Sequence, residues 1–341
     1  MTLAVVAGLP LTAAFALTRH RAARAARGAR ASRVPRASRA ARGARGAAAV
    51  LMLVVSACSS QTTAGGAHPM IAVTPSAPPA VQVSGEPGYL ALGDSIAFGY
   101  RPLPSFADYR NPAAFTAYPE DVARALKLNL VNAACPGETT ASMINTGAPS
   151  NGCETNARGG PGYRRIAPLH VSYRGSQLSY AVRYLQQHPD TRLVTIGIGA
   201  NDLFRCEETT ADHCAGPDLG RALAGVTANL DTILSALRNQ ARYRHALVVV
   251  TYYALNYGDA ASVTPVEALN AALAGPAARY GATVADMFSA FRAASAGHGD
   301  DTCTAGLTFA LPGGCDLHPT ARGQQLMASV VERAIAPVTA G

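Results

Sequence analysis

The sequence predicts an α/β fold in which helices cover both faces of a parallel sheet. From about residue 88 onward, short apolar runs alternate with amphipathic stretches, a pattern typical of such folds. Ser95, Gly137 and Asn201 each follow one of the first three apolar runs. Ligands of open parallel sheets bind outside the carboxyl ends of the strands. We therefore expect these three residues to share one rim of the sheet.

Apolar runs and helical periodicity predict five strands and five helices in alternation. The stretch from residue 219 shows the clearest helical spacing, with apolar residues three or four positions apart at Leu223, Val226 and Leu230. Residues 138–175 and 203–217 lack clear periodicity, and we expect them to be long loops that form the walls of a substrate groove. The expected strands are residues 89–92, 128–132, 193–197, 246–251 and 283–286, and the expected helices are residues 119–126, 177–187, 219–240, 266–280 and 321–335.

The net charge of +8 belongs to the first 57 residues and not to the predicted globular part. Residues 1–57 contain ten arginines and no acid, which leaves 19 basic and 21 acidic residues in the rest of the chain. The remainder is therefore slightly acidic, and we infer no nucleic-acid partner.

Residues 1–57 are interpreted as an export leader. The run over 46–57 has about the length of a signal-peptide core and is too short for a comfortable membrane span. Residues 55–58 resemble the bacterial lipobox, which predicts that Cys58 is lipidated and anchors the protein to the membrane. An ordinary secretory signal, a translation start further downstream and a first membrane segment over residues 3–17 remain as alternatives.

The chain therefore divides into three predicted parts. These are the leader over residues 1–57, a lipid-anchor cysteine with a linker rich in Pro, Ser and Thr over residues 58–87, and one domain over residues 88–341.

Six cysteines follow Cys58, and an even number in an exported chain suggests disulfides. Fifteen pairings are possible for six cysteines. We favour pairs of neighbours in sequence, because each pair would close one loop near the predicted rim. A metal site is disfavoured, since the chain has no CxxC pair and His213-Cys214 lacks partners at ligand spacing. The favoured pairs are Cys135–Cys153, Cys206–Cys214 and Cys303–Cys315.

The polar residues on the predicted rim are those that acyl transfer requires. Ser95 ends a strand on a turn that needs glycine, which is a good position for a nucleophile. Serine is inert at its own pKa, so a base must take its proton, and His318 precedes the last helix. The N–H groups of Ser95 and Gly137 and the amide of Asn201 are candidate donors to a developing oxyanion.

Four blocks of the sequence resemble those of the SGNH, or GDSL, hydrolase superfamily. The blocks are Gly93-Asp94-Ser95, Asn132 to Gly137, Gly199-Ala200-Asn201-Asp202 and Leu317-His318-Pro319-Thr320, and the resemblance covers about residues 88–336. It implies a three-layer α/β/α fold with a five-stranded parallel sheet in the flavodoxin-like order 2-1-3-4-5. It also implies Ser95 as nucleophile, His318 as base, and Gly137 and Asn201 as oxyanion donors. The six cysteines are similar in arrangement to the three disulfides of secreted bacterial members.

The third member of the implied triad departs from the family pattern. The family often has aspartate three residues before the histidine, a position that Cys315 occupies here, whereas Asp316 lies two before it. Either Asp316 or a backbone carbonyl in the turn over residues 313–315 could orient the imidazole.

The sequence thus predicts a monomeric, exported serine hydrolase that cleaves small-molecule or lipid carboxylic esters without a metal or organic cofactor. One alternative is a polysaccharide O-acetyl esterase with the same site. Another, from a different class, is a surface binding lipoprotein that has lost turnover.

Overall fold

The structure is a computed structural model that describes residues 85–156 and 158–339. The predicted leader, the lipobox at Cys58 and nearly all of the predicted linker lie outside the described residues. Within the described part of the chain, no helix is both long and apolar enough to cross a membrane.

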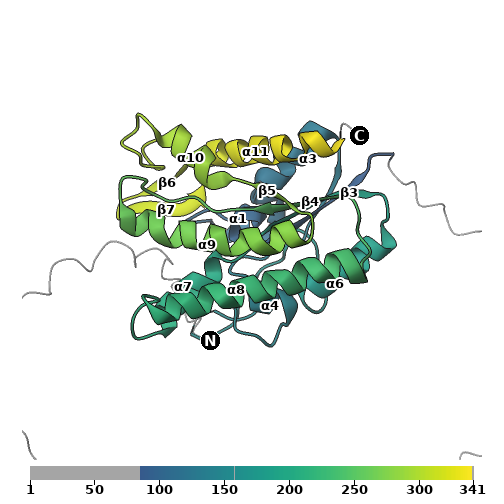
Figure 1. Ribbon diagram of the computed structural model, residues 1–341, viewed down its shortest axis with the longest axis horizontal. Coiled ribbons are helices and arrows are strands. Elements are labelled where there is room, and N and C mark those ends of the chain that lie inside the picture. Colours follow the sequence, from purple (N-terminus) through teal and green to yellow (C-terminus); the bar gives the residue numbers. More distant parts are fainter. Residues whose placement is uncertain (1–84, 157, 340–341) are drawn as a thin grey trace, which may run out of the picture. The chain divides into compact units, whose positions relative to one another are not determined.

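A single parallel sheet of five strands forms the centre of the described domain (Figure 1). Its order is β2-β1-β3-β4-β5, so the predicted fold class and strand order are confirmed. All six residues of β1 are buried, as expected for an inner strand of a sheet covered on both faces. The strands are β1 (Gly88–Gly93), β2 (Asn129–Asn132), β3 (Thr191–Gly197), β4 (Ala246–Val250) and β5 (Thr283–Ala285).

Helices cover the two faces of this sheet. In Figure 1, α3, α10 and α11 lie on one side, while α4, α6 and α8 lie on the other and α9 packs against α8. The helices are α1 (Ser95–Phe98), α2 (Phe106–Arg110), η1 (Pro112–Ala114), α3 (Tyr118–Leu126), α4 (Thr140–Ile144), α5 (Tyr163–Ile166), α6 (Gln177–Gln187), α7 (Ala200–Thr209), α8 (Pro217–Ser235), η2 (Ala236–Gln240), α9 (Ala260–Arg279), α10 (Met287–Ser295) and α11 (Ala321–Thr339).

The helix α8 illustrates how the sequence produces this layer. Pro217 opens the helix, where its missing N–H costs nothing. Val226, Leu230 and Ile233 recur at helical spacing and are completely buried. The predicted helix over 219–240 is therefore present, although its last turn widens into the π-helical segment η2.

Several stretches differ from the sequence-based expectation. The loop predicted over residues 138–175 contains the short helices α4 and α5, α9 begins at Ala260 and not at residue 266, and α10 was not expected. Two further differences lie closer to the predicted rim. The predicted loop over residues 203–217 begins inside a helix, because α7 extends to Thr209. Only Asn201 and Cys206 of α7 are buried, so this helix has no apolar stripe for periodicity to detect. The second difference is an antiparallel hairpin, β6 (Thr308–Leu311) and β7 (Gly314–Pro319), which carries the region of His318.

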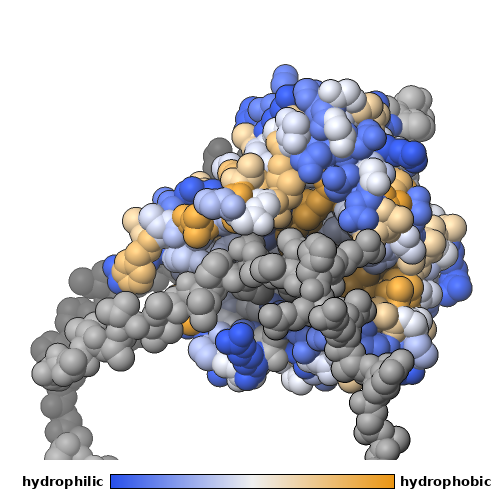
Figure 2. Space-filling view, turned by 90° about the vertical axis from the view of Figure 1, so that its left-hand side faces the viewer, coloured by the Kyte–Doolittle hydropathy of each residue, from blue (hydrophilic) through white to orange (hydrophobic). Residues whose placement is uncertain are grey.

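The three disulfides join the pairs expected from the sequence, Cys135–Cys153, Cys206–Cys214 and Cys303–Cys315. The first fastens the loop after β2 to the segment before α5, the second fastens α7 to the loop before α8, and the third fastens β7 to the loop before β6. The carboxyl ends of the strands point to the left in Figure 1, and Figure 2 looks onto this side, where apolar residues are visible at the surface among hydrophilic ones.

Candidate active site

Ser95 stands on a tight turn at the carboxyl end of β1. Gly93 has a φ of +143°, and a Cβ atom there would lie 2.3 Å from the carbonyl oxygen of Gly197, so no other residue fits. Asp94 caps α1, since its Oδ1 accepts the N–H of Ile96 at 3.0 Å. Ser95 is then the first residue of α1, and its hydroxyl is held at the rim of the sheet.

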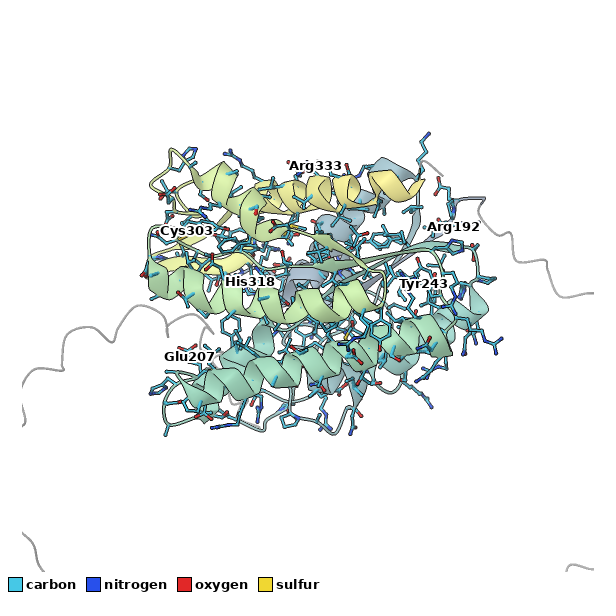
Figure 3. The ribbon with its side chains drawn as sticks, in the orientation of Figure 1. Arg192, Glu207, Tyr243, Cys303, His318 and Arg333 are labelled. Carbon is cyan, nitrogen blue, oxygen red and sulfur yellow. A yellow bond between two sulfur atoms is a disulfide. The ribbon has the colours of Figure 1, made fainter. Side chains whose placement is uncertain are left out.

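The structure brings Ser95 and His318 together, although they are 223 positions apart in sequence. The Nε2 atom of His318 lies 3.1 Å from Oγ of Ser95. On the other side of the ring, Nδ1 lies 2.7 Å from Oδ1 of Asp316. Because a carboxylate accepts, Nδ1 carries the proton and Nε2 is left to accept the serine hydroxyl. His318 is marked in Figure 3.

The spacing of two residues between Asp316 and His318 is explained by the strand β7. Side chains two apart along a strand point to the same face, so the carboxylate can reach the imidazole directly. Asp316 is buried, and its Oδ1 also accepts the backbone N–H of His318 at 2.8 Å. Of the two alternatives left open by the sequence, the carboxylate and not a turn carbonyl therefore contacts Nδ1.

Two tyrosines hold β7 against the rim. The hydroxyl of Tyr253, which follows β4, donates to the carbonyl oxygen of Leu317 at 2.7 Å. The ring of Tyr100, which follows α1, lies 5.0 Å from the ring of His318 between centroids. The histidine is thus supported from segments that follow two different strands.

The loop around Gly137 is shaped by close contact with the segment 151–153. Gly137 has a φ of +78°, and a Cβ atom there would lie 2.4 Å from Cα of Gly152. The carbonyl oxygen of Gly137 accepts the N–H of Asn151 at 2.8 Å. Together with the disulfide Cys135–Cys153, these contacts fix the direction of the peptide groups at Gly137.

Asn201 lies in the first turn of α7 and is held by a second asparagine. Its Oδ1 accepts Nδ2 of Asn151 at 3.1 Å, which leaves its own Nδ2 to donate elsewhere. Within the residues that the structure describes, neither this amide nor the N–H groups of Ser95 and Gly137 have a protein acceptor. The three predicted oxyanion donors are therefore available to a bound molecule.

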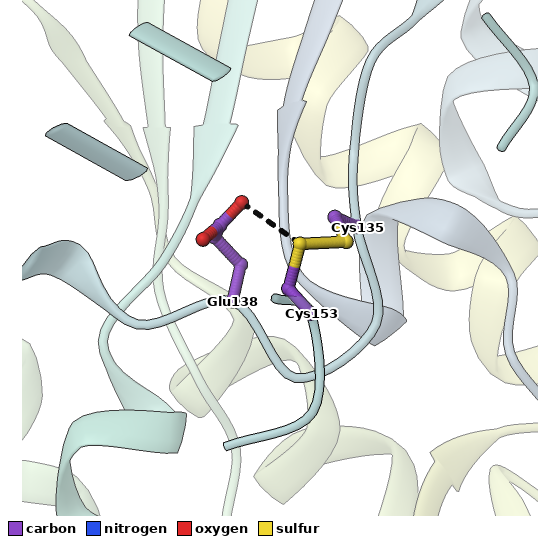
Figure 4. Close-up of side chains that lie close together, drawn as sticks. All are labelled: Cys135, Glu138 and Cys153. Atoms are coloured by element: carbon purple, nitrogen blue, oxygen red, sulfur yellow. Dashed lines mark hydrogen bonds between the residues drawn. A yellow bond between two sulfur atoms is a disulfide. The ribbon is translucent and has the colours of Figure 1, made fainter. Parts of the chain in front are cut away.

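A buried glutamate follows Gly137. Burial raises the pKa of Glu138 to about 8. Its Oε1 accepts the hydroxyl of Ser142, and its Oε2 lies 3.4 Å from Sγ of Cys153 (Figure 4). Because a disulfide sulfur has no hydrogen to donate, a hydrogen bond across the latter contact requires the protonated carboxyl.

Gln177, at the start of α6, connects this glutamate to the nucleophile turn. Its Oε1 accepts the N–H of Gly93 at 2.6 Å, and its Nε2 donates to the carbonyl oxygen of Gly93 at 3.0 Å. The same Nε2 lies 3.1 Å from Oε2 of Glu138. Sequence reasoning missed both Gln177 and Glu138, because a single buried polar residue leaves no pattern in one sequence.

Two further carboxylates, those of Asp94 and Asp202, brace the rim. Burial raises the pKa of Asp94 to about 6, and Tyr252 donates to its Oδ2 at 2.6 Å. Burial likewise raises the pKa of Asp202 to about 6, and the hydroxyl and N–H of Thr140 donate to its two oxygens at 2.6 and 2.9 Å.

Other features of the described residues do not add to this site. Two groups of side chains lie close enough together to share a metal ion, one around Glu138 and one around Asp301. In each group the two cysteines form a disulfide and offer no thiolate, so neither group is a suitable metal site. A surface hollow of about 530 Å³ beside Tyr243 lies at the amino ends of β3 and β4, on the opposite side of Figure 3 from His318.

A serine, a histidine and a carboxylate in one hydrogen-bonded line is the arrangement shared by serine hydrolases. Residues 91–326 match the model of the GDSL-like lipase/acylhydrolase family, and the chain belongs to this family. A search of curated proteins found no match.

Several solved structures are similar to the described fold. A phospholipase A1 from Streptomyces albidoflavus and an extracellular lipase from Streptomyces rimosus each share 22% identity with a TM-score of 0.46, over 73% of this chain and 99% of theirs. An acetylxylan esterase from Geobacillus stearothermophilus shares 17% identity with a TM-score of 0.45, over 73% of this chain and 94% of its own.

Proposed function

We propose that this protein is an exported serine hydrolase that cleaves carboxylic esters through an acyl-enzyme on Ser95. One observation supports the proposal above all others: the hydrogen-bonded line from Ser95 through His318 to the buried carboxylate of Asp316. Membership of the GDSL-like lipase/acylhydrolase family supports an ester as the substrate.

In the first half-reaction, Oγ of Ser95 attacks the carbonyl carbon of the ester while its proton passes to Nε2 of His318. Negative charge develops on the carbonyl oxygen, and the N–H groups of Ser95 and Gly137 and the amide of Asn201 donate to it. Asp316 stabilises the doubly protonated imidazole. The bond to the alcohol oxygen then breaks, the alcohol leaves with the proton from Nε2, and the acyl group stays on Ser95.

In the second half-reaction, water takes the place of the alcohol. His318 removes a proton from water as the oxygen attacks the acyl carbon, and the same three donors bind the second oxyanion. Collapse of this intermediate breaks the bond to Oγ, which takes the proton back. The products are a carboxylic acid and the free enzyme.

Export is the second part of the proposal, and the three disulfides support it, because such bonds persist in oxidising compartments. A lipid on Cys58 would tether the domain to the membrane. Mass spectrometry of the mature protein tests this part. A diacylglycerol adduct on an N-terminal Cys58 supports both export and the tether. A mature chain that begins beyond Cys58 contradicts the tether but not export, and a chain that keeps the leader contradicts export.

A fluorophosphonate probe tests the nucleophile, since it reacts only with an activated serine. We expect the wild type and the control Ser172→Ala, which alters an exposed serine of the described domain, to be labelled equally. We expect Ser95→Ala to be unlabelled and inactive on p-nitrophenyl esters. A folded, oxidised wild type that does not react would contradict the proposal and favour a binding protein.

The acyl group is tested with p-nitrophenyl esters of graded chain length and an acetylated polysaccharide. Hydrolysis that increases with chain length supports a lipid or aliphatic ester substrate. Activity confined to the acetylated polysaccharide would instead identify an O-acetyl esterase with the same catalytic residues.

A further inference from the structure

Large apolar side chains are exposed in only a few places on the described domain, and three of them lie in two neighbouring segments. Leu103 and Phe106 are 72% and 73% exposed, and Ile166 is 67% exposed. The other two, Leu126 and Val284, are only 38% and 37% exposed. Isolated exposure is ordinary, but three such side chains on two neighbouring segments indicate an interaction surface. We call Leu103, Phe106 and Ile166 the apolar rim.

The two segments, residues 99–116 and 158–175, lie side by side next to the proposed catalytic histidine. The ring of Tyr109 in α2 lies 6.0 Å from that of Tyr163 in α5, and the ring of Tyr100 lies 6.5 Å from it. Tyr100 in turn lies 5.0 Å from His318. The tyrosines thus join the two segments that carry the apolar rim and connect them to His318.

The charge of these segments is opposite to that of the rest of the domain. They contain six arginines and one acid, a net charge of +5, whereas the other residues of 85–341 contain 13 basic and 20 acidic residues, a net charge of −7. Arg101 and Arg164 are paired with Asp108 and Glu154.

The other four arginines of these segments are exposed and without an ion pair among the described residues, namely Arg110, Arg158, Arg165 and Arg174. Arg110 lies over the ring of Phe106, 4.4 Å from its centroid, so one basic group directly flanks the apolar rim.

We propose that the apolar rim and these four arginines dock on an anionic phospholipid bilayer. Exposed apolar side chains flanked by arginines suit the bilayer interface, where the former enter the boundary between headgroups and acyl chains and the latter meet lipid phosphates. The excess positive charge argues for this occupant over a neutral surface. The inference goes beyond the proposed function, because docking requires no turnover. Docking would bring Tyr100 and His318 close to the lipid.

The chain contains no tryptophan, so one introduced tryptophan reports its own surroundings. We place it in the Ser95→Ala protein that begins at residue 59, which lacks the arginine-rich leader and the proposed lipid anchor, as F106W, with L103W as a second reporter and V284W as the matched control. Vesicles contain equal parts of phosphatidylcholine and phosphatidylglycerol, with or without brominated acyl chains. The Ser95→Ala background prevents hydrolysis of the vesicles and separates this test from that of the proposed function.

We expect the emission of F106W and L103W to shift to the blue and to be quenched by brominated lipid, while that of V284W does neither. If the vesicles bind the protein and all three reporters behave alike, the contact lies elsewhere on the chain and the proposal is wrong. Melting curves confirm that each variant is folded.

Three of the four arginines are tested by the triple variant R110Q/R165Q/R174Q in the F106W background. An arginine near an anionic membrane contributes enough for about a 5-fold change in affinity, so we expect binding to weaken by about 10- to 100-fold. The control R242Q/R292Q/R322Q removes three exposed arginines outside the two segments and should bind normally. Equal affinities of the two triple variants for the vesicles would overturn the proposal. It would also be overturned if the domain bound a soluble protein and brominated lipid did not quench the tryptophan of F106W.

Discussion

At position 316, one carboxylate oxygen contacts both the backbone and the ring of His318. This double contact has two consequences for the residue. It fixes the rotamer of Asp316, and it selects the imidazole tautomer that leaves Nε2 free for Ser95. A backbone carbonyl could supply the second effect but not a negative charge beside the protonated ring.

The substitution Asp316→Asn tests the importance of that charge. We expect kcat to fall by about 10²–10⁴-fold, because an amide neither stabilises the protonated ring nor selects the correct tautomer. Steady-state kinetics on a p-nitrophenyl ester gives the value, and a melting curve shows that the fold is kept. Near-full activity would mean that another group orients the imidazole.

Gln177 is the other single residue on which the site geometry depends. Its side chain accepts the N–H of Gly93 and donates to the carbonyl oxygen of Gly93, which is buried and lies two residues before Ser95. We expect Gln177→Leu to lower the free energy of unfolding by about 1–3 kcal/mol, since the buried N–H of Gly93 loses its partner. The carbonyl oxygen of Gly93 keeps the N–H of Cys135 at 3.0 Å. Urea denaturation measures the change in unfolding free energy.

We also expect kcat of Gln177→Leu to fall while KM changes little, because the hydrogen bonds position the nucleophile and not the substrate. Gln187→Leu, at an exposed position of the same helix, is the matched control and should leave both values unchanged. A variant as stable and active as this control would show that the contacts at Gly93 are dispensable.

At the scale of the element, the loop after β2 depends on glycine for two separate reasons. Gly137 has a positive φ, and it also lies against the backbone of Gly152. We expect Gly137→Ala to lower activity at least about tenfold, because the loop must move and carry a proposed oxyanion donor with it.

The chain offers a control that separates the two reasons. Gly159 also has a positive φ, of +80°, but nothing lies within 4 Å of the position of its Cβ atom. Gly159→Ala should therefore cost only about 1–2 kcal/mol of stability, with normal activity. Comparison of kcat and melting temperature for the two variants shows whether the contact with Gly152 matters in addition to the positive φ. Equal effects would mean that the contact with Gly152 is unimportant.

The elements differ in how far the sequence predicts them. The five strands were predicted to within about two residues, because strands buried on both faces are continuous apolar runs. The bounds of α6 agree with the predicted 177–187. The hairpin β6–β7 was missed, because its strands are short and their residues only partly buried.

Because the hairpin is not predicted, the sequence leaves both Asp316 and a turn carbonyl as groups that could orient His318. A spacing of two residues suits a strand, whereas a turn was expected before His318. The positions of Ser95, Gly137, Asn201 and His318 could be predicted because each stands in a family block at the end of an element. Glu138 and Gln177 could not, since burial and hydrogen bonding arise only when segments distant in sequence meet.

At the scale of the whole molecule, the buried glutamate makes stability depend on pH. Glu138 binds a proton up to pH of about 8 in the folded protein, against an ordinary pKa of 4.5. Its contribution to stability is therefore fully present below about pH 4.5 and is lost as the pH rises through about 8. Asp94 and Asp202, whose pKa values are raised to about 6, act in the same direction at lower pH.

The variant Glu138→Gln isolates this effect, because an amide resembles the protonated acid and cannot ionise. We expect the wild type to lose a few kcal/mol of unfolding free energy relative to the variant between about pH 4.5 and pH 8. The two aspartates are common to both proteins and cancel in the difference. Urea denaturation across this range provides the values. A difference that is constant with pH would show that Glu138 does not change its ionisation there.

The proposed nucleophile lies at the start of the described domain, and its partner His318 lies 223 residues later, in the final hairpin. A ribosome or an export channel releases the chain from its amino end. The serine therefore emerges long before the imidazole does, and a nascent or half-translocated chain has no complete site. If the proposed function holds, this order of synthesis keeps the enzyme latent toward the lipids of its own cell until nearly the whole domain has crossed.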